Sequence, residues 1–329
     1  MIVFEHVNKV YPSGIEAVRD LCLTVEAGET MVLLGTSGSG KTTTMKMVNR
    51  LIEPSGGKIR IDGCNVLDRN PVELRRSIGY AIQHIGLFPH MTVAQNIAVV
   101  PSLLGWPAGE IEDRVDRLLA MVGLEPEDFR DRFPGQLSGG QKQRIGVARA
   151  LAADPPVVLM DEPFGALDPI TREQLQNEFL SLESEIEKTI VFVTHDIFEA
   201  VKMGDRIALL DNGVLQQLAT PAELVENPAN PFVDDFLGQH RFQLALLTRS
   251  VRAVVETGNS SQVAESAETA AAKSLDPEAS LIDALDWFKR NREDEVALRD
   301  RHGKLAGVLR RSELVAAIGR VIEAGGSCQ

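Results

Sequence analysis

The sequence is poor in cysteine and aromatic residues and has no long apolar run. Only 5% of its 329 residues are aromatic, and its three cysteines are scattered. Cys22, Cys64 and Cys328 therefore fit neither a disulfide framework nor a zinc site. No apolar stretch reaches the roughly 18 residues that a membrane-spanning helix requires. The N-terminal residues lack a basic flank followed by a long apolar region, so they do not resemble a signal peptide and a soluble, cytosolic chain is expected.

The bulk composition limits the possible functions further. The net charge of −13 argues against a nucleic-acid partner, although it leaves local docking on a membrane protein open. With 44% hydrophobic residues, the chain can bury a substantial core, and its length suggests two or three folding units.

One segment carries a specific chemical signal, because a glycine-rich stretch at 35–42 follows the apolar run Met31–Leu34. Its pattern, G-x-x-x-x-G-K-[ST], lets backbone amides surround phosphate oxygens at the start of a helix. Lys41 is expected to reach the β- and γ-phosphates, and Thr42 to place its hydroxyl on Mg²⁺. A chance glycine- and serine-rich turn is the alternative, but strand, loop and helix-compatible residues occur in the required order. The predicted nucleotide-binding residues here are Gly35, Thr36, Ser37, Gly38, Ser39, Gly40, Lys41, Thr42 and Thr43.

A second anion site is predicted where Leu-Ser-Gly-Gly-Gln at 137–141 precedes a helix-compatible run. An ordinary capped helix start is the alternative. The apolar run Val157–Met160 then ends in Asp161 and Glu162. An acid at the end of a buried strand beside a P-loop is expected to hold Mg²⁺, and the adjacent glutamate to polarise the attacking water.

Three further residues have weaker individual signals. His195 follows the apolar run Thr189–Val193, so it lies at the same sheet edge and is a candidate γ-phosphate contact. Gln83 follows a candidate strand at 78–82, and Tyr11 is a candidate for stacking on adenine. Each has an ordinary structural alternative.

The order of the elements predicts a parallel sheet covered by helices, because strands alternate with helices. Residues from about 90 to 150 are predicted to be mainly helical, and Leu175–Glu187 is a plausible crossover helix. The small, polar residues 256–274 are predicted to be a linker. A small β-α unit is predicted after it.

Taken together, these motifs resemble the nucleotide-binding subunits of ABC transporters. The resemblance covers residues 1 to about 238 and includes a Q-loop at Gln83, the signature at 137–141, and a D-loop at 166–168. It implies a P-loop α/β domain with an N-terminal β subdomain and a helical subdomain at about 88–150.

The resemblance also assigns roles to residues. Glu162 would be the catalytic base, His195 would stabilise the γ-phosphate, and Gln83 would sense Mg²⁺ held by Thr42 and Asp161. ATP would lie in a head-to-tail dimer with a second copy, whose Ser138, Gly139, Gly140 and Gln141 close the site, together with Asp168. Integral membrane permease subunits would be direct partners, a solute-binding protein an indirect one. The protein would sit peripherally at the cytoplasmic face of the plasma membrane.

Residues 85–92 and 49–52 are more specifically similar to ATPases that import glycine betaine, choline or carnitine. Importers of amino acids or other small solutes remain an alternative, and a non-transport ABC ATPase is a more distant one. Residues 239–274 are expected to connect the ATPase domain to residues 275–329, which resemble a single CBS motif. That region is expected to be regulatory, with ionic strength as the sensed signal, and a packing or dimerisation element is the alternative.

Overall fold

The computed structural model describes residues 1–82, 86–165, 167–183, 188–257, 274–300 and 303–326. The chain divides into two compact units, which meet at Thr220 and Pro221. None of the helices within the described ranges combines the length and the apolar composition needed to cross a bilayer.

The N-terminal unit is built on a six-stranded sheet. In spatial order its strands are β10 (Val214–Ala219), β9 (Arg206–Asp211), β3 (Thr30–Gly35), β8 (Thr189–Val193), β7 (Val157–Asp161) and β6 (Ile78–Ala81). All neighbours are parallel except the edge pair of β10 and β9. Every residue of β3, β7 and β8 is buried, which explains why their sequences are mainly apolar rather than alternating. The predicted parallel sheet is thus confirmed.

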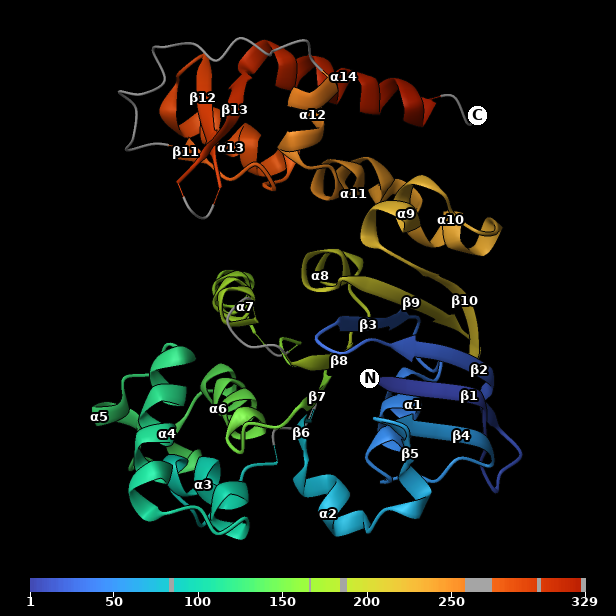
Figure 1. Cartoon of the computed structure of the whole chain (residues 1–329), viewed down its shortest axis with the longest axis vertical. Coiled ribbons are helices and arrows are strands. Elements are labelled where there is room, and N and C mark those ends of the chain that lie inside the picture. Colours follow the sequence, from blue (N-terminus) through green and yellow to red (C-terminus); the bar gives the residue numbers. More distant parts are fainter. Residues whose placement is uncertain (83–85, 166, 184–187, 258–273, 301–302, 327–329) are drawn as a thin grey trace. The chain divides into compact units, whose positions relative to one another are not determined.

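A second, antiparallel sheet packs in the same unit. Its strands, in spatial order, are β2 (Glu16–Val25), β1 (Ile2–Val10), β4 (Gly56–Ile61) and β5 (Cys64–Asn65). Helix α1 (Lys41–Val48) lies between the two sheets, because Met45, Met47 and Val48 belong to one apolar cluster with residues of both. The position of α1 in Figure 1 shows this arrangement. The helix that follows the phosphate-binding loop is therefore anchored in the core.

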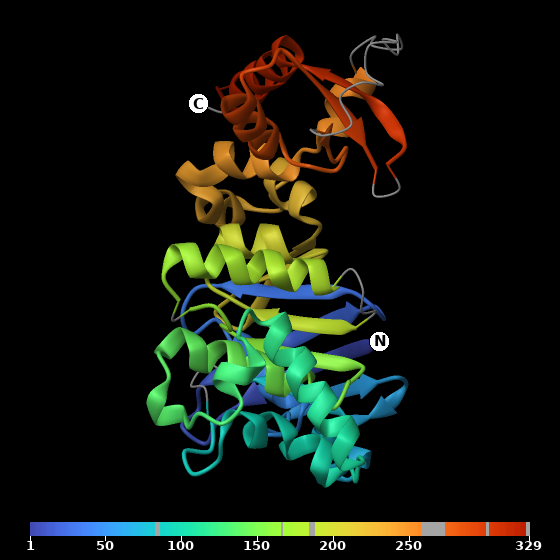
Figure 2. The same cartoon turned by 90° about the vertical axis from the view of Figure 1, so that its left-hand side faces the viewer.

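Helices cover the other side of the six-stranded sheet. The remaining helical elements of this unit are η1 (Val66–Asp68), α2 (Pro71–Arg76), α3 (Val93–Leu103), α4 (Ala108–Met121), α5 (Pro126–Phe129), η2 (Pro134–Gln136), α6 (Gly139–Leu151), α7 (Pro169–Glu183) and α8 (Ile197–Met203). Figure 2 shows α4, α6 and α7 in front of the strands. The helical prediction for 90–150 is confirmed. The crossover helix begins at Pro169 rather than at Leu175, because Asp168 accepts a hydrogen bond from the Thr171 amide at its start.

The C-terminal unit begins with helices that the sequence did not predict. They are α9 (Pro221–Glu226), α10 (Pro231–Leu237), η3 (Gly238–His240), α11 (Arg241–Thr248) and α12 (Val251–Thr257). A three-stranded sheet follows, formed by β11 (Ser274–Leu275), β12 (Glu295–Arg299) and β13 (Leu305–Arg310), with α13 (Leu281–Asn291) and α14 (Arg311–Gly326). The boundary between the two units lies between Thr220 and Pro221. The sequence places the end of the ATPase domain later, at residue 238, and that domain assignment stays a prediction. Most of the predicted linker lies outside the described residues.

Candidate functional site

The glycine-rich loop joins the carboxyl end of β3 to the N-terminus of α1. Gly38 and Gly40 have φ angles of 80° and 97°, in the region that favours glycine. At Gly40 a Cβ atom would lie 2.3 Å from the Ala17 carbonyl oxygen, so a side chain would force the loop away from β2. The loop therefore keeps its backbone close to the neighbouring strand, and its amides face a cavity.

Lys41 is held at the base of this loop. Its ammonium group donates to the carbonyls of Gly35 and Thr36, at 2.8 and 2.7 Å, and to the Ser39 hydroxyl at 3.3 Å. Burial lowers the pKa of Lys41, while the charges of Glu162 and Asp161 oppose this shift. The ammonium group of Lys41 is thus incompletely solvated. An anionic ligand in the cavity would stabilise its charged form.

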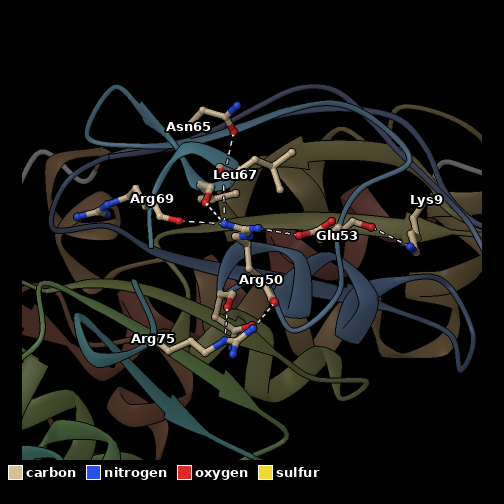
Figure 3. Close-up of polar contacts among 9 residues, drawn as sticks. Lys9, Arg50, Glu53, Asn65, Leu67, Arg69 and Arg75 are labelled. Atoms are coloured by element: carbon tan, nitrogen blue, oxygen red, sulfur yellow. Dashed lines mark hydrogen bonds and ion pairs between the residues drawn. The ribbon is translucent and has the colours of Figure 1, made fainter. Parts of the chain in front are cut away.

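The far end of α1 is tied to two neighbouring segments. Arg75 of α2 donates to the carbonyl of Asn49 at 3.2 Å and to that of Arg50 at 2.6 Å (Figure 3). Arg50 in turn donates to the carbonyls of Leu67 and Arg69, at 3.1 and 2.9 Å. A helix leaves its last carbonyls without internal partners, and here a guanidinium group satisfies those just beyond α1. This junction gives Asn49 and Arg50, two residues of the stretch 49–52, a structural role.

An oxygen-rich pair lies beside the loop. The Thr42 hydroxyl donates to Asp161 Oδ1 at 3.1 Å, and Asp161 is only 3% exposed. Burial raises the pKa of Asp161, while the hydrogen bond from Thr42 and the charge of Lys46 oppose this shift. Hydroxyl and carboxylate oxygens are the donors that Mg²⁺ prefers. A cation here would also offset the unfavourable burial of the carboxylate.

Glu162 and His195 contact each other across the ends of β7 and β8. His195 Nδ1 lies 3.1 Å from Glu162 Oε1. An ionised carboxylate only accepts hydrogen bonds, so Nδ1 carries the proton in this contact. Glu162 has a φ of 47°, and its amide donates to the Val193 carbonyl at 2.9 Å. The strained backbone is thus held by β8, the strand that also places His195.

These residues share one cavity of about 480 Å³. Its lining includes Ser37 to Thr43 of the loop, Glu162 and His195. Tyr11 reaches the same loop, with its hydroxyl 3.2 Å from the Thr43 hydroxyl. The structure therefore brings together loop, carboxylate and imidazole as the sequence predicted.

The predicted signature residues are absent from the described lining of this cavity. Ser138 caps α6 by accepting from the Gln141 amide at 3.2 Å, while Gln141 accepts from the Ser138 amide. Ser138 and Gly139 are exposed. Asp168 is also exposed, and the hydrogen bond from Thr171 lowers its pKa. Gln83 and Ala166 lie outside the described residues.

One residue near the site was missed in the sequence. Gln143 of α6 is only 5% exposed and donates from Nε2 to the Glu162 carbonyl at 3.1 Å. It thereby links the signature helix to the backbone of the candidate base. Its position two residues after the signature was the only available signal, and one glutamine on a helix predicts no partner.

Comparison with known proteins identifies the family. A family described as ABC transporter matches residues 18–165. The chain is 50% identical over 307 residues to the glycine betaine/carnitine/choline transport ATP-binding protein of Bacillus subtilis, which covers 93% of this chain and 77% of that protein. It is 46% identical over 315 residues to the glycine betaine uptake system ATP-binding protein of Escherichia coli, covering 96% of this chain and 99% of that one. The chain belongs to the ABC transporter ATP-binding proteins.

Solved structures agree with this assignment of the ABC ATPase. The dimeric structure of a bacterial ABC transporter cassette matches at 36% identity with a TM-score of 0.63, covering 67% of this chain and 98% of that one. A dimeric post-hydrolysis state bound to ADP and phosphate matches at the same identity with a TM-score of 0.62 and the same coverage. The predicted P-loop fold is confirmed, and the protein is an ATP-binding, ATP-hydrolysing subunit of a transporter.

Proposed function

We propose that this ABC ATPase energises the import of a quaternary-amine osmoprotectant such as glycine betaine, choline or carnitine. The supporting observation is the identity of 46% and 50% to the Escherichia coli and Bacillus subtilis proteins, extending over more than nine tenths of this chain. Those two proteins are named for glycine betaine, carnitine or choline transport. Because the similarity includes the C-terminal unit, it is not limited to the part that all ABC ATPases share.

The proposed ATP contacts follow from the geometry of the loop. Residues 35–43 would bind the phosphates through backbone amides and hydroxyls, and Lys41 would exchange its carbonyl partners for phosphate oxygens. Tyr11 would contact the adenine. Burial disfavours the charged ammonium group of Lys41 when no anion is bound. Part of the binding energy of ATP would therefore come from the phosphate charge that compensates this buried cation.

The proposed cation is Mg²⁺, with Thr42, Asp161 and Gln83 as the residues that would hold it. When bound, it would supply a positive charge against the phosphate oxygens. The contact between Thr42 and Asp161 supports this role for both residues. The assignment of Gln83 as a Mg²⁺ ligand depends on the family resemblance alone.

Hydrolysis needs a base for the attacking water, and Glu162 is the proposed group. Its carboxylate lies in the wall of the cavity and opposite the glycine-rich loop. His195 would orient this carboxylate through Nδ1, and its other ring nitrogen would donate to the γ-phosphate when it carries a proton as well. The hydrogen bond from Gln143 would fix the backbone of Glu162 in the same position.

The active form is proposed to be a head-to-tail dimer. Ser138 to Gln141 are exposed or half-buried at the N-terminus of α6 and fall outside the cavity of their own chain. In a second copy they would face the phosphates from the opposite side, and Asp168 would lie at the same interface. A helix N-terminus attracts anions, so ATP would hold the two copies together and its hydrolysis would release them.

The permease is proposed to dock in a cavity of about 320 Å³ beside β6. Phe88, Tyr80 and the arginines Arg75, Arg76 and Arg149 are among its lining residues. Burial raises the pKa of Tyr80 to about 12, so its hydroxyl is neutral. Apolar and cationic groups together suit a short helix that carries an acidic residue. This assignment would place the protein at the cytoplasmic face of the membrane, with a solute-binding protein as an indirect partner.

Residues 275–329 are proposed to regulate transport as a CBS-like region, with ionic strength as the proposed signal. The surplus of acidic residues in the chain supports this idea, since salt screens their mutual repulsion. Removal of residues 241–329, which leaves the predicted ATPase domain in place, should weaken the response of uptake to salt. An unchanged response would contradict the proposal.

Uptake by cells tests the substrate class. The gene would be deleted in its host, and uptake of labelled glycine betaine, choline, carnitine and an amino acid would be measured. Loss of at least one quaternary amine, restored by the wild-type gene but not by Glu162→Gln, supports the proposal. Loss of amino-acid uptake alone would contradict it.

A further inference from the structure

Three side chains with metal-binding chemistry meet on the antiparallel sheet of the N-terminal unit. His6 lies on β1, and Asp20 and Cys22 lie on the adjacent β2. His6 Nδ1 is 2.8 Å from Asp20 Oδ1 and 3.6 Å from Cys22 Sγ. One potential ligand atom from each residue lies within 4.8 Å of the other two. None of the three residues belongs to the nucleotide site described above.

Irregular strand pairing produces this arrangement. The register of β1 and β2 shifts between Phe4 and Val7 and again between Val7 and Lys9. His6 and Asp20 lie at these irregularities and have φ angles of 48° and 47°. A bulge re-aims the side chain that it carries, and here the two bulged residues point at each other.

Asn8 holds the two bulges together. Its side chain donates to the His6 carbonyl and accepts from the Asp20 amide, both at 2.8 Å. In addition, the His6 amide points at Cys22 Sγ at 3.4 Å. Hydrogen bonds between β1 and β2 therefore hold the backbone that carries the three side chains, although the side chains themselves are exposed.

The distance between His6 and Cys22 matches a small tetrahedral ion, and the distance between His6 and Asp20 must increase. With Zn–N of about 2.0–2.1 Å and Zn–S of about 2.3 Å, a tetrahedral ion holds imidazole nitrogen and thiolate sulfur roughly 3.6 Å apart. The observed separation of His6 Nδ1 and Cys22 Sγ is 3.6 Å. Nitrogen and carboxylate oxygen would be roughly 3.4 Å apart, so the Asp20 contact must open by about 0.6 Å from its hydrogen-bonded distance.

We propose that His6, Asp20 and Cys22 form a three-ligand site for Zn²⁺, with water in the fourth position. A thiolate, an imidazole and a carboxylate are the donors that zinc takes in proteins, while Mg²⁺ disfavours sulfur and nitrogen. Binding displaces the thiol proton of Cys22 to solvent, and His6 binds through its neutral Nδ1. Cysteine spacing alone predicts no zinc site, because the proposed site joins one cysteine to a histidine and an aspartate across two strands.

Metal titration of the full-length, tag-free chain tests this proposal. Cys64 and Cys328 would be replaced by serine, so that Cys22 is the sole remaining cysteine. Zn²⁺ would be titrated without ATP or Mg²⁺, and Co²⁺ would then serve as a spectroscopic substitute. One zinc ion per chain and a thiolate-to-cobalt charge-transfer band are expected.

Matched variants locate the site. Cys22→Ser and His6→Gln should each abolish the cobalt band and weaken zinc binding at least tenfold, whereas His90→Gln should change neither. Asn8→Ala removes only the residue that orients the ligands, so a loss of about 10–100-fold is expected with the band retained. Zinc binding of equal strength in Cys22→Ser, or a cobalt spectrum without a thiolate band, would overturn the proposal and leave a surface hydrogen-bond cluster.

Discussion

Replacement of Glu162 by glutamine is the most informative single change at the nucleotide site. The amide keeps the size of the side chain and can still accept the hydrogen bond from His195 Nδ1, which lies 3.1 Å from the carboxylate. It cannot take a proton from water. General base catalysis contributes typically 10²–10⁴-fold, so turnover should fall by that factor, equivalent to about 2.7–5.4 kcal/mol in the barrier.

ATP binding should survive the same change. The contacts of Lys41 with Gly35, Thr36 and Ser39 do not involve Glu162. The negative charge of Glu162 raises the pKa of Lys41, and its removal makes the cavity more favourable for an anion rather than less. ATP affinity is therefore expected to remain or to increase.

The assay is steady-state phosphate release, with nucleotide affinity measured separately by equilibrium titration. Glu173→Gln is the matched control, because it makes the same chemical change at an exposed position on α7. Turnover in Glu162→Gln above about a tenth of the wild-type rate would refute the role of Glu162 as base. Loss of ATP binding would refute the separation of binding from chemistry.

Three further predictions concern charge and tethering. Lys41→Ala should lower ATP affinity at least tenfold in equilibrium titration, since a charge-assisted hydrogen bond contributes about 1.5–3 kcal/mol; unchanged affinity would contradict the assignment. Burial raises the pKa of Glu199 above its usual 4.5, so the folded protein holds more protons than the unfolded chain above pH 4.5, and stability falls as pH rises through that window. Glu199→Gln should remove this loss, and its Tm relative to wild type should increase from acid to neutral pH; a constant difference would contradict the reasoning. Arg75→Gln should destabilise the N-terminal unit by about 1–3 kcal/mol in thermal unfolding through the loss of two carbonyl contacts, with partial recovery in Arg75→Lys; an unchanged Tm would show that the junction at the end of α1 is not stabilising.

The parts of the fold that follow a local pattern could be predicted from the sequence. Strands β7 and β8 are mainly apolar because both of their faces are buried, and that environment is visible in the runs 157–160 and 190–193. The phosphate-binding loop was predictable for a similar reason, since its chemistry resides in eight adjacent positions. Asp161 and His195 could be placed because Asp161 ends β7 and His195 follows β8.

Features that depend on distant pairing could not be predicted. Strand β11 has two residues and exists because Ser274 and Leu275 pair with Ala297 and Leu298. Helix α11 buries Leu244 against its neighbours. Its eight residues fall in the predicted connecting region 239–274, and they show no strong helical periodicity from which the helix could be predicted.

The same limit applies to single polar residues. The contacts of Gln143 and Arg75 join elements far apart in the chain, and no local pattern encodes such partners. The pairing of His6 with Cys22 depends on strand bulges, which the sequence does not reveal. The signature residues lie outside the cavity of their own chain, and the proposal that they bind the nucleotide of another copy accounts for this position.

Sedimentation of the Glu162→Gln protein with and without Mg-ATP tests most directly the proposal that two copies share the nucleotide. A monomer that becomes a dimer on addition of ATP, and that stays monomeric with ATP bound when Ser138 is also replaced by arginine, is the predicted result. A Glu162→Gln protein that binds ATP yet remains monomeric, or a dimer indifferent to Ser138→Arg, would contradict it.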